Sequence, residues 1–108
     1  MSKLSEKHEE ERRVIMYLIK TILDSRTKQR RTDGRYPNRI GSKVDIVNLT
    51  IEGAMEPGNM LVLDYVEDNQ GNPKDGTLRS SRILDIISYG RIIEIVTHNS
   101  IYVLEEIV

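Results

Sequence analysis

Residues 77–108, TLRSSRILDIISYGRIIEIVTHNSIYVLEEIV, decide the fold because most of their apolar side chains are β-branched. Branched side chains fit a pleated strand better than a helix, where branching at Cβ restricts their rotamers. Tyr89-Gly90 and His98-Asn99 interrupt the run with residues that tolerate the left-handed conformation of tight turns. The pattern predicts three antiparallel strands, at about 78–88, 91–97 and 100–106.

Two further apolar runs precede this region, at residues 43–51 and 60–66. A Pro-Gly turn within 56–59 separates them, and the polar stretch 67–76 is expected to be an exposed loop. Residues 32–41, with two Gly and one Pro, predict a second loop. The two apolar runs bring the expected number of strands to five.

The segment 1–31 carries the pattern of an amphipathic helix, which is clearest over residues 5–31. Glutamates gather near its start and basic residues near its end, as the helix macrodipole favours. Apolar residues recur at spacings of three and four, and they are Val14, Ile15, Leu18, Ile19, Ile22 and Leu23. We expect this stripe either to mediate dimerisation or partner docking, or to pack against the chain's own sheet.

Together these elements predict an α+β protein in which a long N-terminal helix precedes a five-stranded antiparallel meander. We expect a single domain over residues 1–108, with the helix in 1–31 and the sheet in 41–108. The sheet either closes into an SH3-like small barrel or stays open and strongly curved under the helix. We favour the barrel, because a flat sheet leaves its edges poorly protected.

The formal net charge of −1 conceals two segments of opposite sign. Residues 24–43 contain seven Lys/Arg and two Asp, whereas residues 44–76 contain seven Asp/Glu and one Lys. This separation argues against a uniformly basic nucleic-acid-binding surface. It leaves one positive segment that is able to meet a phosphate or an acidic partner.

The residue types that carry most catalytic and metal chemistry are sparse. The chain has no Cys, and its two histidines, His8 and His98, lie far apart in the sequence. No glycine-rich phosphate loop is present, so we expect no enzymatic activity, no metal and no cofactor. Because no apolar run is long enough to span a membrane and no signal sequence begins the chain, we expect a cytoplasmic protein without a membrane partner.

Arginines interleaved with tyrosine and asparagine make the positive segment the candidate ligand site. Guanidinium groups bind phosphate bidentately, a tyrosine ring can stack on a base, and an amide can read a base edge. The alternative is that the arginines only solvate a helix end and a loop. The predicted ligand-binding residues are Arg31, Arg35, Tyr36, Asn38, Arg39, Lys43, Arg79, Arg82 and Asn99.

The C-terminal part of the sequence resembles the C-terminal end of many short proteins carried by bacteriophages and prophages of Gram-positive hosts. The stretches that carry the resemblance are LRSSRI at 78–83 and THNSIYVL at 97–104. Some phage proteins of this size and build act as sponges that sequester cyclic-nucleotide signals used in host immunity. The resemblance implies a phage-encoded protein with an anti-defence role in the host cytoplasm.

The leading hypothesis is a non-enzymatic protein that sequesters a small anionic ligand, such as a cyclic nucleotide. We expect a homo-oligomer that forms through the N-terminal helix. The second hypothesis is a nucleic-acid-binding or regulatory module that places the basic segment 26–43 along phosphates. The third is a protein adaptor that uses the helix stripe. Salt separates the first two, because many phosphate contacts make affinity fall steeply with salt concentration.

Overall fold

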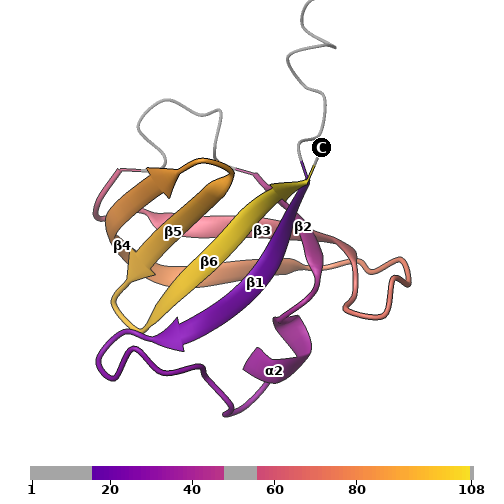
Figure 1. The fold of residues 1–108 in the computed structure, drawn as a ribbon, viewed down its shortest axis with the longest axis horizontal. Helices are drawn as coiled ribbons and strands as arrows, with labels where there is room; N and C mark the ends of the chain where they lie inside the picture. Colours follow the sequence, from indigo (N-terminus) through magenta and orange to yellow (C-terminus); the bar gives the residue numbers. More distant parts are fainter. Residues whose placement is uncertain (1–15, 48–55, 108) are drawn as a thin grey trace, which may run out of the picture.

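The computed structural model describes residues 16–47 and 56–107, and these residues form a closed β-barrel (Figure 1). Its elements are β1 (Met16–Asp24), α2 (Tyr36–Arg39), β2 (Lys43–Ile46), β3 (Met60–Glu67), β4 (Thr77–Tyr89), β5 (Ile92–Thr97) and β6 (Ser100–Ile107). Each strand pairs antiparallel with the next along the chain, and β1 pairs with β6 to close the barrel. Within the described ranges, no helix has the length and apolar character needed to cross a membrane.

β1 stands where the sequence predicted the second half of a long helix, so the expected α+β class is wrong. Tyr17, Ile19 and Ile22 are buried in the core. A register shift between Ile19 and Thr21 marks a β-bulge, which changes the spacing of inward-facing residues from two to three. Apolar residues at this mixed spacing imitate one face of a helix. Residues 5–15 of the predicted helix lie outside the described residues.

The barrel core uses two residues of the apolar stripe that was expected either to mediate dimerisation or partner docking, or to pack against the chain's own sheet. Ile19 and Ile22 are fully buried, so neither is exposed for contact with a second subunit. Leu18 and Leu23, which the helix pattern placed on the same stripe, are only partly buried in β1. No long helix exists over residues 16–31 through which subunits could associate.

The three predicted C-terminal strands are confirmed as β4, β5 and β6. Gly90 makes the β4–β5 turn with a φ of 58°. At the β5–β6 turn, the Thr97 hydroxyl donates to the Ser100 carbonyl oxygen over 2.7 Å and accepts from the Ser100 N–H over 3.0 Å. These hydrogen bonds fix the turn that carries Asn99.

β2 and β3 lie where the two earlier apolar runs predicted strands. β2 ends at Ile46, and residues 48–51 of the predicted strand lie outside the described residues. The barrel has six strands where five were expected, because β1 supplies the additional one. The predicted loop 32–41 contains a short helix, α2.

The barrel interior is mainly aliphatic, as expected for a chain without Phe or Trp. Its buried members are Tyr17, Ile19, Ile22, Val44, Ile46, Leu61, Leu63, Leu78, Ile83, Ile95, Tyr102 and Leu104. Tyr36 and Ile40 pack against this cluster from outside the strands. Because both residues belong to α2 or follow it directly, burial of their side chains holds α2 against the barrel.

Candidate ligand-binding site

α2 lies below β1 in the view of Figure 1 and leads into β2. Residues of the loop that joins β3 to β4 share a pocket with it. Pro37 occupies the first turn of the helix, where its fixed φ fits and its missing N–H costs nothing. The Ile40 N–H donates to the Tyr36 carbonyl oxygen over 3.3 Å and completes the single turn. Gly41 then leaves the helix with a φ of 91°, a conformation that favours glycine.

Tyr36 anchors two guanidinium groups. The guanidinium carbon of Arg31 lies 4.1 Å from the centre of the Tyr36 ring, and that of Arg39 lies 5.1 Å from it. Both distances fall within the range of cation–π attraction. The Tyr36 ring, which the sequence predicted as a stacking face for a ligand, therefore contacts two arginines of its own chain.

Arg31 is held by the fold. Its guanidinium donates to the Asp33 carboxylate over 2.8 and 3.1 Å, to the Asn99 carbonyl oxygen over 3.1 Å and to the Ser100 hydroxyl over 2.9 Å. The same guanidinium lowers the pKa of Asp33, chiefly through these hydrogen bonds. Arg31 thus connects the segment before α2 to the β5–β6 turn, and Asp33 neutralises its charge.

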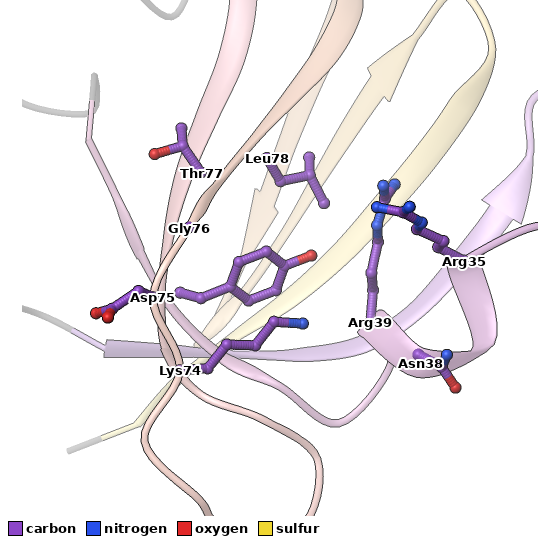
Figure 2. A pocket seen from close by; sticks show the side chains of 9 residues that line it. Arg35, Asn38, Arg39, Lys74, Asp75, Gly76, Thr77 and Leu78 are labelled. Atoms are coloured by element: carbon purple, nitrogen blue, oxygen red, sulfur yellow. The ribbon is translucent and has the colours of Figure 1, made fainter.

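A cavity of about 360 Å³ lies between α2 and the start of β4, and we call it the α2 pocket (Figure 2). α2 and its N-cap contribute three lining residues, β3 contributes one, the segment that leads into β4 contributes three, and β4 contributes two. The lining residues are Arg35, Asn38, Arg39, Tyr65, Lys74, Asp75, Gly76, Thr77 and Leu78.

The α2 pocket is positively charged. In Figure 2, the side chains of Arg35, Arg39 and Lys74 extend toward the cavity, whereas the Asp75 carboxylate points away from it. Among residues 16–47 and 56–107, no carboxylate oxygen lies within 4.0 Å of the charged nitrogens of these three cations. Asp68 interacts with Lys74 only at longer range: backbone hydrogen bonds chiefly lower the pKa of its carboxyl, and the positive charge of Lys74 helps to lower it. The pocket therefore contains three cations, none of which forms an ion pair with a described residue.

Two phenols lie close to these cations. The Lys74 ammonium lies 4.1 Å from the centre of the Tyr65 ring. Burial raises the pKa of Tyr65, and the Arg39 guanidinium opposes part of that rise. Burial, assisted by the proximity of Tyr36, raises the pKa of Tyr102 to about 12. Both hydroxyls therefore stay protonated at neutral pH, when they can donate a hydrogen bond and carry no negative charge.

A second pocket of about 400 Å³ lies on the Arg31 side of Tyr36. Its lining residues are Asp24, Ser25, Arg26, Arg31, Tyr36, His98 and Asn99. Asp24 lies in its wall, and Asp33 already binds Arg31. Its charges are therefore more nearly balanced than those of the α2 pocket, so the α2 pocket is the better site for an anion.

The structure places the nine predicted site residues in three groups. Arg35, Asn38 and Arg39 line the α2 pocket, and the second pocket is lined by three others, Arg31, Tyr36 and Asn99. The remaining three line neither pocket: Lys43 lies 3.5 Å from Glu67 in an ion pair, and Arg79 and Arg82 are exposed on β4.

Sequence reasoning missed Lys74 and Tyr65, which belong to the α2 pocket. Lys74 carried a usable signal, because it is the one basic residue in the acidic stretch 44–76. Tyr65 gave none, since a tyrosine within an apolar strand reads as a core residue.

No protein-family model, curated protein or solved structure matches the chain. Across the part of the chain that the structure describes, no group of three or more His, Cys, Asp or Glu side chains is arranged to hold a metal ion.

Proposed function

We propose that this protein is a non-enzymatic binding module that holds a small anionic ligand of the nucleotide type in the α2 pocket. The observation that carries the proposal is the convergence of Arg35, Arg39 and Lys74 on one cavity, where none of them forms an ion pair with a carboxylate of the described residues. A cavity of about 360 Å³ lies within the size range of small-ligand pockets.

The side chains of the pocket support binding more than turnover. Guanidinium and ammonium groups donate hydrogen bonds but have no free lone pair with which to take up a proton at neutral pH. The raised pKa of Tyr65 keeps its hydroxyl protonated, so it is a donor and a poor base. A pocket built from such donors can hold an oxyanion through charge-assisted hydrogen bonds.

Residues 78–83 and 97–104 resemble short phage proteins, and some phage proteins of this size and build are sponges, which capture a ligand without converting it. This resemblance agrees with the proposal.

Nucleic-acid binding is the second candidate, and one observation favours it. Arg26, Lys28 and Arg30 are exposed in the segment that follows β1 and leads toward α2. Together with the α2 pocket they offer a longer positive surface, along which several phosphates could lie.

Isothermal titration of the full chain with ATP, at low and moderate salt, tests the proposal, with adenosine as the uncharged control. We expect ATP to bind and adenosine not to bind. Arg39→Gln should weaken ATP binding by about tenfold or more, because it removes a charge-assisted contact. Arg91→Gln is the matched control, since Arg91 is exposed in the β4–β5 turn and lines neither described pocket.

Equal losses in the two variants, or no ATP binding at all, would contradict the proposal. A single-stranded oligonucleotide in the same titration tests the second candidate. Tighter binding of the oligonucleotide than of ATP, with a steep fall in affinity as salt rises, would favour the nucleic-acid module instead.

A further inference from the structure

The number of positive charges around the α2 pocket determines how much negative charge a bound phosphate group should carry. Arg35, Arg39 and Lys74 supply three cations, and Asp75 is the sole carboxylate among the lining residues. Because the Asp75 carboxylate points away from the cavity, it does not offset these cations at the position of a ligand (Figure 2).

Arg35 is placed at a cost to α2. Arg35 is the N-cap of the helix and provides no side-chain capping hydrogen bond. A cation at this end opposes the helix dipole, and like charges four residues apart repel each other. Helix stability therefore does not explain Arg35, whereas Arg39 lies in the last turn, where the dipole favours a cation. A bound anion with enough charge would relieve the repulsion between the two arginines.

The uncharged part of the wall offers little to a nucleobase. Its apolar side chains are Tyr65 and Leu78, and Leu78 is only 4% exposed. The Lys74 ammonium occupies the space over the Tyr65 ring, 4.1 Å from the ring centre. Recognition in the α2 pocket therefore centres on the phosphate end of a ligand.

Resting on the proposed function, we propose that the α2 pocket selects the doubly charged phosphate of a terminal phosphomonoester over the singly charged phosphodiester. A phosphomonoester carries close to two negative charges at neutral pH, whereas each phosphodiester carries one. A dianion neutralises two of the three cations, and a diester leaves two of them facing each other. The preference runs against cyclic nucleotides and the nucleic-acid backbone, and it favours nucleotides with a free terminal phosphate.

Calorimetric titration of the full chain with 5′-AMP and with 3′,5′-cyclic AMP, at about pH 7.5 and about pH 5, tests the preference. At the higher pH we expect 5′-AMP to bind about tenfold more tightly than cyclic AMP, because it brings a second charge and a further charge-assisted hydrogen bond. At the lower pH the second phosphate proton returns, since its pKa is about 6, and the difference should shrink.

Inorganic sulfate controls for titration of the pocket itself, because it keeps two charges at both pH values. The charged and titratable groups that line the pocket are Arg35 and Arg39 from the α2 region, Tyr65 from β3, and Lys74 and Asp75 from the segment before β4. If these groups keep the same charge at both pH values, the affinity for sulfate stays constant. A parallel fall in sulfate and 5′-AMP affinity would overturn the inference.

Arg35→Gln should reduce the preference for 5′-AMP over cyclic AMP, and Arg91→Gln should leave it unchanged. Equal affinities for 5′-AMP and cyclic AMP at both pH values would refute the preference while the proposed anion-binding function stands. Tighter binding of cyclic AMP would refute it in the same way. Failure of every anion to bind would overturn both the preference and the proposed function.

Discussion

Ile19→Ala tests the assignment of residues 16–24 to a strand whose alternate side chains enter the barrel. Ile19 is fully buried and pairs with Leu104 of β6. The substitution removes roughly three methylene equivalents, which corresponds to about 2.4 kcal/mol of transfer free energy at about 0.8 kcal/mol each. The cavity left in a rigid core raises the expected loss of unfolding free energy to about 3–4 kcal/mol.

Leu18→Ala is the matched control, because Leu18 is adjacent to Ile19 but only partly buried. We expect it to cost about 1 kcal/mol or less. Urea denaturation followed by far-UV circular dichroism measures both values, provided that the slopes of the transitions agree. Equal losses for the two variants would refute the strand assignment, since a helix stripe would bury both residues.

Two further predictions concern the surroundings of α2. Arg31→Met should lower the free energy of unfolding by about 2 kcal/mol or more, since it leaves the buried Ser100 hydroxyl without its guanidinium donor; a change of less than about 0.5 kcal/mol in urea denaturation would contradict this. The pKa of Tyr102 is raised from 10.0 to about 12, so the unfolded chain loses this proton first and stability should fall as pH rises from about 10 to about 12. Tyr102→Phe should flatten that fall in urea denaturation at a series of alkaline pH values, and an unchanged profile would contradict the assignment.

The predictability of the strands depended on whether their apolar pattern was regular. β4, β5 and β6 were predicted because β-branched residues and turn residues such as Gly90 agree with each other. β1 was not predicted, because a bulge between Ile19 and Thr21 breaks the alternation that identifies a strand. The glutamates near the chain's start and the basic residues after β1 then completed a convincing but wrong helix pattern.

The candidate site was predicted only in part, for a different reason. Arg35, Asn38 and Arg39 are close in sequence, so one dense segment indicated them. Lys74 joins them because the pairing of β2 with β3 places Lys43, shortly after α2, opposite Glu67, where the β3–β4 loop begins. Spacing along the sequence does not show that Lys74 and the α2 residues are neighbours, because their proximity depends on the register of the strands.

Arg31 and Arg39 show why a count of positive residues along the sequence did not distinguish structural arginines from ligand-binding ones. Both contact the ring of Tyr36, yet their surroundings differ. Arg31 is bound by Asp33 and by the β5–β6 turn, so its replacement should mainly reduce stability. Arg39 faces the α2 pocket without an ion pair among the described residues, so its replacement should mainly reduce anion binding. The Tyr36 ring thus contacts both Arg31, which holds α2 in place, and Arg39, which is available to bind a ligand.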